Sequence, residues 1–345
     1  MLLAGRLRFL LPALAGVLLA MTGMIAGPPP ARAEVGEIRI PLGAGGFGFL
    51  PLYVMQARGL IEQRAHAAGL DLLQVRWIKV GGPTAVNEAL LSGSVDFIAA
   101  GPPAFLILWS RTTTSMKVRS VAAMTAMPTY LTTRQQRLQS LDDFAPGDKI
   151  AVTAPRVSIV AICMQMYARQ KYGAAETYRF EPLTLPISHP DATVAMLAGS
   201  DSITADWSSP PFYQREMKDP AIHTITTTDK LLGGPATFTM LSTTAKFHDD
   251  NPKAYAAVLA ALQDAVALIK ADKVAAAKIF LAAEPGGFSQ DEIVAILENP
   301  DMQFGTTPTG IQKYADFMYD VGLIKVHPAS WKDVFFPEIQ DAPGN

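Results

Sequence analysis

The segment ITADWSSPPF, residues 203–212, places a carboxylate, an indole ring and two hydroxyls side by side. A carboxylate beside serines occurs in hydrolases, so Asp206, Ser208 and Ser209 are candidates for nucleophilic catalysis. That chemistry also needs a positioned base, and the sequence places none of its five histidines beside this loop. The same residues are equally compatible with a strand-to-helix turn, or with the wall of a binding site in which the Trp207 ring packs against a solute.

The segment GAGGFG, residues 43–48, satisfies the G-x-G-x-x-G pattern directly after a predicted strand. We do not expect a dinucleotide site, because bulky residues and Pro51 follow where a helix should begin against a pyrophosphate. Two interpretations remain. The glycines let this loop approach a bound solute closely, or they form a turn without a ligand.

Other catalytic and metal-binding patterns are missing from the sequence. It contains no G-x-S-x-G, no H-E-x-x-H and no Cys/His metal spacing, so we expect no metal, no cofactor and no enzymatic activity. His189 precedes Pro190 at the start of a predicted helix, where it either supports the turn or contacts a ligand. The single cysteine, Cys163, lies in an apolar helical run and is expected to be a buried, inert thiol.

Several predicted helices start directly after strands with residues that suit a polar solute. Thr84, Gly101, Arg156 and Ser158 stand at such starts. The unpaired amide hydrogens of a helix start favour a negative group by about 0.3–1 kcal/mol per helix. Each hydroxyl can instead act as an ordinary N-cap.

Strand and helix patterns alternate from Glu34 onward, which predicts an α/β protein with parallel sheets. The predicted strands are residues 37–42, 72–80, 96–100, 118–124 and 149–154. The predicted helices include residues 51–69, 83–91 and 158–172, and a helical C-terminal part over 249–271, 273–284 and 307–324. For the last two helices we expect Asp272 and Thr307 as N-caps.

Two segments, residues 89–105 and 195–212, share one layout of helix end, Gly-Ser turn, short strand and Pro-Pro before a phenylalanine. The match predicts two similar α/β lobes with equivalent loops, although turn residues alone can produce such a likeness. The polar stretch over residues 132–148 is typical of a connection at the entry to a second domain. A chain of this length is also expected to divide into two domains.

The N-terminus predicts export. Arg6 and Arg8 precede an apolar run that ends before GPPPARAE, which is the layout of a signal peptide cut after Ala33. No later segment is expected to span a membrane. Removal of residues 1–33 leaves 26 basic and 31 acidic residues, a formal charge of −5, which argues against nucleic-acid binding.

The order of these segments resembles the periplasmic solute-binding proteins of nitrate, sulfonate and taurine ABC importers. The resemblance is carried by PLYVMQARGLIEQ, ALLSGSVDF, SLDDFAPGDKIAV, SHPDATVAMLAGSDSITADWSSPPF and LLGGPATFTMLSTTAKF. It implies a type II-like fold of two Rossmann-like lobes, a hinge and an interlobe cleft. Lobe 1 would comprise residues 34–128 and 236–345, and lobe 2 residues 129–235.

The same resemblance implies a small-molecule solute in the cleft, an ABC permease of the inner membrane as partner, a periplasmic location and a monomeric state. Carried over by position, the ligand-binding residues are Phe47, Gly48, Phe49, Thr84, Gly101, Pro102, Pro103, Arg156, Ser158, His189, Asp206, Trp207, Ser208 and Phe238. The aromatic residues among them favour an organic solute, either a sulfonate-like anion or an aromatic or heterocyclic compound. An exported hydrolase and the sensing subunit of a membrane receptor are the alternatives.

Overall fold

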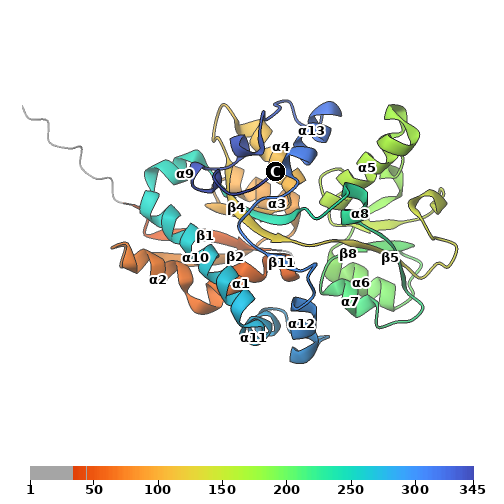
Figure 1. Ribbon diagram of the computed structural model, residues 1–345, viewed down its shortest axis with the longest axis horizontal. Coiled ribbons are helices and arrows are strands. Elements are labelled where there is room, and N and C mark those ends of the chain that lie inside the picture. Colours follow the sequence, from red (N-terminus) through yellow and green to blue (C-terminus); the bar gives the residue numbers. More distant parts are fainter. Residues whose placement is uncertain (1–33, 44) are drawn as a thin grey trace, which may run out of the picture. The chain divides into compact units, whose positions relative to one another are not determined.

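The computed structural model describes residues 34–43 and 45–345, and strands alternate with helices along much of this part of the chain (Figure 1). The expected signal peptide and its cleavage position lie outside the described residues. The strands are β1 (Glu37–Leu42), β2 (Gln74–Lys79), β3 (Phe97–Ala100), β4 (Arg119–Ala126), β5 (Tyr130–Thr133), β6 (Ile150–Val152), β7 (Thr184–Pro186), β8 (Ala205–Ser208), β9 (His223–Thr227), β10 (Thr237–Thr243) and β11 (Gln303–Phe304).

The α-helices between these strands match the predicted helical segments in most places. They are α1 (Leu50–Arg58), α2 (Leu60–Ala67), α3 (Gly82–Leu91), α4 (Pro102–Thr112), α5 (Ile159–Tyr172), α6 (His189–Leu197), α7 (Phe212–Glu216), α8 (Thr228–Leu232), α9 (Ala245–Asp250), α10 (Pro252–Ala271), α11 (Lys273–Ala283), α12 (Gln290–Leu297) and α13 (Ile311–Asp320). A 3₁₀ turn, η1 (Phe47–Phe49), precedes α1.

A first group of strands contains both ends of the described chain. β1 pairs with β2, and β11, β4, β10 and β3 form a four-stranded sheet. Arg39 of β1 reaches the Asp96 carboxylate just before β3, with the Arg39 amide 2.8 Å from Oδ2, which connects the two sheets. Helices α1, α2 and α10 pack together beside this group (Figure 1).

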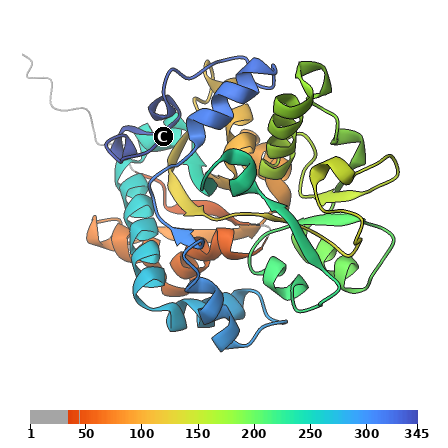
Figure 2. The same cartoon turned by 45° about the vertical axis from the view of Figure 1, so that its right-hand side comes forward.

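A second group of strands forms one five-stranded sheet in the order β7, β6, β8, β5, β9. All of these strands fall between residues 130 and 227. Helices α5, α6, α7 and α8 lie beside this sheet, as the turned view also shows (Figure 2). Its buried apolar residues, such as Leu131, Val152 and Trp207, form a core cluster distinct from the larger one of the first group.

The two groups are joined by residues 127–129, between β4 and β5, and by residues 233–236, between α8 and β10. These connections explain why the sheets are not purely parallel, as the alternation of elements predicted. β6 runs parallel to β7 and β8, whereas β5 runs antiparallel to β8 and β9, and β10 runs antiparallel to β3 and β4. β5 and β10 each enter their sheet from the other group, so they run against their neighbours.

Two local expectations about helices were wrong. The helix predicted over residues 51–69 is divided into α1 and α2, because Gly59 adopts the left-handed conformation with φ 58°. Thr307 does not cap the last long helix, which begins after Gly310 with φ 73° and without a side-chain cap. The cap expected at Asp272 is confirmed, since its Oδ1 accepts a hydrogen bond of 2.8 Å from the Ala275 amide.

Helix α10 corrects the expectation that no later segment reaches membrane-spanning length. By length and composition alone, the 20 residues of α10 are apolar enough to cross a bilayer. An 18-residue stretch of this helix has a mean hydropathy of 1.5, and half of that stretch is buried within the fold. Ala254, Val258 and Leu262 belong to the buried core, as expected of a helix that covers a sheet in an α/β protein.

Candidate functional site

A cavity with about 760 Å³ of empty space, part of it open to solvent, lies where the carboxyl ends of β1, β2, β3 and β6 meet the starts of several helices. Crevices at the carboxyl ends of strands are the usual ligand sites of α/β folds. The lining residues are Gly43, Gly45, Phe49, Val80, Gly82, Pro83, Val86, Ala99, Ala100, Gly101, Ala104, Thr129, Thr153, Val157, Ser158, Ile159, Val160, His189, Phe238 and Thr239.

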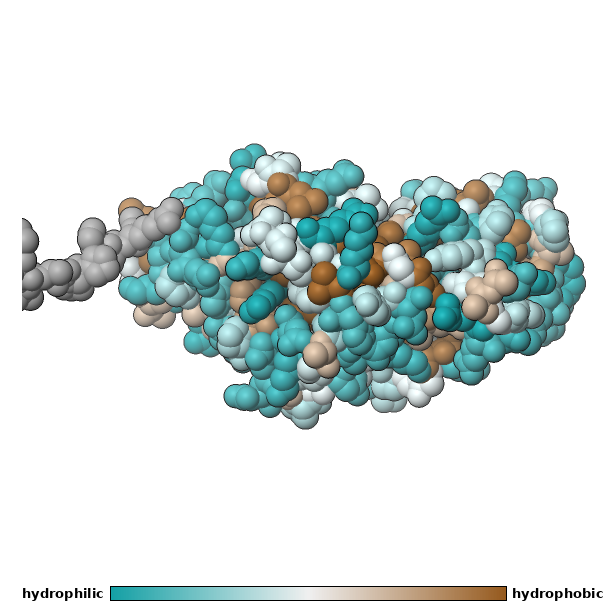
Figure 3. Space-filling view, turned by 90° about the horizontal axis from the view of Figure 1, so that it is seen from above, coloured by the Kyte–Doolittle hydropathy of each residue, from teal (hydrophilic) through white to brown (hydrophobic). Residues whose placement is uncertain are grey.

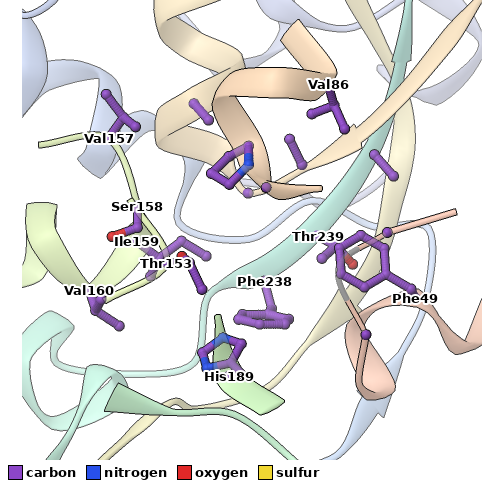
Figure 4. A pocket seen from close by; sticks show the side chains of 18 of the residues that line it. Phe49, Val86, Thr153, Val157, Ser158, Ile159, Val160, His189, Phe238 and Thr239 are labelled. Atoms are coloured by element: carbon purple, nitrogen blue, oxygen red, sulfur yellow. The ribbon is translucent and has the colours of Figure 1, made fainter. Parts of the chain in front are cut away.

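The lining consists mainly of apolar side chains and backbone atoms. Figure 4 shows the Phe49 and Phe238 rings at the cavity, with His189 below Phe238 and with Thr153 and Ser158 on the side that carries α5. In the space-filling view, apolar residues gather in the middle of the face between two mainly hydrophilic regions (Figure 3). Contact with apolar atoms should therefore supply much of the affinity for an occupant.

Glycines in residues 43–48 leave room for aromatic side chains of the protein to pack against the backbone. A Cβ atom at Gly43 would lie 2.0 Å from the Phe49 ring, and one at Gly48 would lie 2.5 Å from the Phe238 ring. Both distances are far too short for a side chain, so glycine at these positions lets the two rings lie against the backbone. The loop therefore brings Phe49 and Phe238 to the cavity wall.

The neighbouring Gly46 brings this loop to the second group of strands. Its Cβ position lies 3.0 Å from the Pro210 carbonyl, which accepts a hydrogen bond of 3.0 Å from the Phe47 amide. Behind the loop, Glu284 accepts hydrogen bonds from the Gly46 amide at 2.7 Å and from the Tyr53 hydroxyl at 2.6 Å. Burial raises the pKa of Glu284.

Ser158 and His189 stand at the starts of α5 and α6. The Ser158 hydroxyl accepts a hydrogen bond of 3.4 Å from the Ala161 amide, so it is the N-cap of α5 as well as part of the lining. Ser188 is the N-cap of α6, and the next residue, His189, lines the cavity. The His189 ring also stacks on Phe212, outside the lining, with ring centroids 6.0 Å apart.

Burial lowers the pKa of His189 to about 4, and a hydrogen bond with the Trp207 backbone partly offsets this effect. The imidazole is therefore uncharged at neutral pH. An uncharged imidazole can both donate and accept a hydrogen bond but brings no formal charge to the cavity.

The cavity lining contains no aspartate, glutamate, lysine or arginine among the described residues. Prolines also remove amide donors from the helix starts that face it: Pro83 in α3, Pro102 and Pro103 in α4, and Pro190 in α6. Helix α5 begins without a proline, with Ile159 and Val160 in the lining. The array of helix-end donors expected from the sequence is thus much reduced.

Of the predicted ligand-binding residues, Phe49, Gly101, Ser158, His189 and Phe238 line the cavity, and their contact with a ligand stays a prediction. The other predicted residues of the first group of strands lie near the cavity but outside its lining. Phe47 and Gly48 are buried beneath the loop, Pro102 and Pro103 are buried in the first turn of α4, and Thr84 points to solvent on α3. Thr84 lies between the lining residues Pro83 and Val86, and its contact with a ligand stays a prediction.

Arg156 was also expected at the cleft, and the structure directs it elsewhere. Its φ of 68° turns the side chain to Glu181, whose Oε1 accepts a hydrogen bond of 2.7 Å from Arg156 Nε. Arg156 lines a separate small pocket together with Glu181 and Gln165. The predicted contact of Arg156 with a cleft ligand is therefore not supported.

The segment that opened the sequence analysis is buried. Asp206, Trp207 and Ser208 form β8 and expose at most 1 % of their surface, and none of them lines the cavity. β8 is a central strand, so its side chains alternate between the two covered faces of the sheet. The expectation of a Trp207 cleft wall is wrong. Burial also contradicts the alternative of a catalytic loop at residues 206–209, since Ser209 is equally buried.

On one face of β8, Asp206 and Ser208 meet Glu216 of α7. Ser208 and Thr193 donate to Glu216 Oε1 at 2.9 and 3.0 Å, and Thr132 donates to Oε2 at 2.6 Å. Burial, followed by the charge of Glu216, raises the pKa of Asp206 well above its ordinary value. Burial therefore favours the protonated form of Asp206, and the cluster around Glu216 is a structural arrangement inside the second sheet.

The sequence analysis missed Thr129 and Thr153 as lining residues. Thr153 follows β6 directly, and the rule that ligands lie beyond the carboxyl ends of strands could have identified it. Thr129 lies in the connection between β4 and β5, and no local pattern in the sequence marks it.

No cluster of three or more His, Cys, Asp or Glu side chains suitable for a metal ion occurs among residues 34–43 and 45–345. Cys163 is buried, and burial raises the pKa of its thiol to about 12, so it is not a reactive nucleophile.

No protein-family model matches this sequence, and no curated protein matches it. Solved structures do resemble it. The alkanesulfonate-binding protein SsuA from Xanthomonas axonopodis pv. citri bound to MOPS aligns with a TM-score of 0.66 at 18 % identity, over 88 % of this chain and 99 % of its own. The periplasmic aliphatic sulphonate-binding protein SsuA from Escherichia coli aligns with a TM-score of 0.62 at 16 % identity, over 88 % and 92 % of the two chains.

The periplasmic nitrate-binding protein NrtA from Synechocystis PCC 6803 aligns with a TM-score of 0.62 at 15 % identity, over 87 % of this chain and 84 % of its own. The chain thus has the two-lobed α/β fold of periplasmic binding proteins, as the sequence predicted. No charged side chain among the described residues lines its cavity.

Proposed function

We propose that this protein is the extracytoplasmic solute-binding component of an ABC importer and captures a small organic solute in the cavity described above. The observation that carries the proposal is the cavity itself, which lies at the strand ends and helix starts of both groups of strands within a periplasmic binding protein fold. Its aromatic wall and few polar groups have the composition of a small-molecule site.

The proposal treats the two groups of strands as lobes, with residues 34–128 and 236–345 in lobe 1 and residues 129–235 in lobe 2. The connections at residues 127–129 and 233–236 are the hinge. Contacts between the lobes support a ligand-dependent closure. They include the Phe47 amide bound to the Pro210 carbonyl at 3.0 Å, and Lys218 Nζ paired with Glu292 at 2.5 Å.

Under this proposal the protein is exported by a signal peptide cut after Ala33, acts as a monomer in the periplasm and delivers its solute to an inner-membrane permease. The basic, apolar and small-residue segments of the N-terminus support export. An uptake assay that compares the wild-type strain with a strain lacking the gene would separate transport from a sensing role. If the protein serves transport, the strain without it should accumulate less solute.

Binding is tested by native mass spectrometry of the protein purified from its own host or a close relative. We expect a non-covalent adduct of small-molecule mass that is lost after unfolding and returns when the extracted compound is added back. Calorimetry should then give a saturable one-to-one isotherm. A protein that carries no adduct and shows no saturable binding to host extracts would contradict the proposal.

A further inference from the structure

The polar groups of the cavity lie on one side. Thr129, Thr153, Ser158 and His189 come from residues 129–235, whereas Thr239 is the one hydroxyl that the remaining lining residues contribute. Thr239 Oγ1 is already engaged within the protein, 2.6 Å from the Gly48 carbonyl and 2.7 Å from Thr125 Oγ1. The side formed by Phe49, Val86 and Phe238 therefore offers mainly apolar surface to a ligand (Figure 4).

Thr129 has a buried hydroxyl for which the described residues provide no hydrogen-bond partner. Its residue is 1 % exposed and lines the cavity, yet its Oγ1 has no hydrogen-bond partner within the described part of the chain. The backbone at this position is fixed, because the Thr129 amide donates to Thr228 Oγ1 and the Thr129 carbonyl accepts from the Thr228 amide, both at 2.9 Å. A buried hydroxyl without a partner is unfavourable, and a ligand atom in the cavity would satisfy it.

His189 provides a second polar group. One ring nitrogen interacts with the Trp207 backbone, and the ring lines the cavity, so the proposal assigns the other nitrogen to a ligand. If the nitrogen beside the Trp207 carbonyl carries the proton, the free nitrogen accepts a hydrogen bond. A ligand that fits this site therefore presents an N–H or O–H to His189.

Charge argues against an anion. The described lining contains no cationic side chain, and prolines remove amide donors from α3, α4 and α6. Glu284 lies directly behind Gly45, with Oε2 3.3 Å from the position of a Cβ on that glycine. A buried anion would thus lack a counter-charge and have a carboxyl group nearby, and both effects are unfavourable. The start of α5 still suits the partial negative charge of a carbonyl oxygen.

We propose that the cavity binds an uncharged ring compound that carries a carbonyl beside an N–H, as in an aromatic carboxamide or a lactam, and that it rejects the sulfonates and carboxylates of the same ring. The polar edge of the ligand contacts Thr129, Thr153 and His189, while its ring packs on Phe49 and Phe238. This assignment deepens the proposed solute-binding function and depends on it.

The test is calorimetry at neutral pH with protein that has been unfolded, dialysed and refolded to remove bound solute. Benzamide and 2-pyridone are the uncharged probes, and benzoate and benzenesulfonate are the charged ones. We expect at least one uncharged probe to bind at least about 10-fold more tightly than either anion.

An anion that binds as tightly as the uncharged probes would overturn the ligand class and leave the binding function standing. Failure of all four probes would also count against the ligand class. The proposed binding function has its separate test in the native mass spectra, so the two failures are distinguishable.

Two threonine variants separate a ligand contact from a structural role. Thr129→Val should weaken binding of the preferred uncharged probe by about 10-fold without lowering the urea midpoint, because its hydroxyl has no protein partner to lose. Thr239→Val should lower the urea midpoint, because its hydroxyl is bonded within the protein. Unchanged affinity in Thr129→Val, with Thr129→Ser behaving identically, would contradict the assigned contact.

Discussion

The indole nitrogen of Trp207 donates a hydrogen bond to the sulfur of Met164 across 3.4 Å, deep in the core of the second sheet. Met164 belongs to α5, the helix whose first turn reaches the cavity. Trp207 therefore lies outside the cavity lining and instead fixes α5 against β8. Its influence on binding can only be indirect, through the position of α5.

Trp207→Ala should reduce the free energy of unfolding by about 3–5 kcal/mol, because it removes a fully buried ring from a packed core. Urea unfolding followed by circular dichroism measures this loss. Trp207→Phe is the matched control and should lose clearly less, since it keeps most of the buried volume. An unchanged midpoint for Trp207→Ala would mean that the ring is not part of the core.

Asp206→Asn should flatten the dependence of stability on pH. Folding raises the pKa of Asp206, so above about pH 4 the folded state holds a proton that the unfolded state has lost. The wild-type protein therefore loses stability as pH rises from that point toward the folded pKa, and an asparagine has no such proton. Urea midpoints at about pH 5 and about pH 8 should differ less in the variant.

The control for that experiment is Asp201→Asn, which removes an exposed carboxylate from the turn before β8. It should keep the wild-type difference between the two pH values. If Asp206→Asn and the wild-type protein show parallel pH profiles, folding does not raise the pKa of Asp206.

His189→Gln should flatten the dependence of stability on pH in the acid range, where the wild-type protein loses stability as pH falls. Burial lowers the folded pKa of His189 from 6.5 to about 4, so the stability due to the neutral ring is complete above pH 6.5 and is lost as pH falls toward 4. The wild-type urea midpoint should fall across this window more than that of the variant. His66→Gln, at an exposed position on α2, is the control and should retain the wild-type profile. Identical acid profiles for His189→Gln and His66→Gln would contradict the buried, neutral imidazole.

Gly101→Ala should weaken solute binding by about 10-fold. A Cβ at Gly101 would lie 2.9 Å from Ile159 Cδ1 and 3.2 Å from the Phe238 carbonyl, so the Ile159 side chain and the backbone at Phe238, both at the cavity, must shift. The backbone of Gly101 suits alanine, with φ −72°, so the fold should tolerate the change. Calorimetry with the tightest-binding probe measures the effect.

Gly81→Ala is the matched control. Gly81 occupies the same N-cap position on α3, also with an extended backbone, and no atom lies within 4 Å of its Cβ position. Its affinity should equal that of the wild-type protein. Equal affinities in both glycine variants would show that binding does not depend on the close approach of Ile159 and Phe238 to Gly101.

The element order and the helix starts at the cavity could be predicted from the sequence because they depend on local signals. Ser158 was found because it follows a predicted strand and begins a helix, and His189 because it stands before Pro190 at a predicted helix start. Asp206 and Trp207 were misplaced because the pattern shows a strand but not whether both of its faces are covered. That depends on α5, which packs on β8 from an earlier part of the chain, and on α7, which follows β8 closely and folds back against it.

Thr129 illustrates the other limit. It becomes a lining residue because Thr228, far along the chain, fixes its backbone at the junction of the two groups of strands. Only the tertiary structure brings these two residues together. The aromatic wall of the cavity could be predicted only in part. The glycines at 43 and 48 indicated that another group lies close to the backbone there, but not that this group is the Phe49 or the Phe238 ring.

The absence of charged side chains from the described lining has a further consequence for the conditions in which the protein works. Attraction between charges weakens as dissolved ions screen it, whereas contacts between apolar surfaces and short hydrogen bonds are little affected. In the extracytoplasmic location proposed for it, the protein would experience whatever salt concentration its surroundings impose. A site built from Phe49, Phe238 and neutral polar groups would hold its solute equally well in dilute and in saline water.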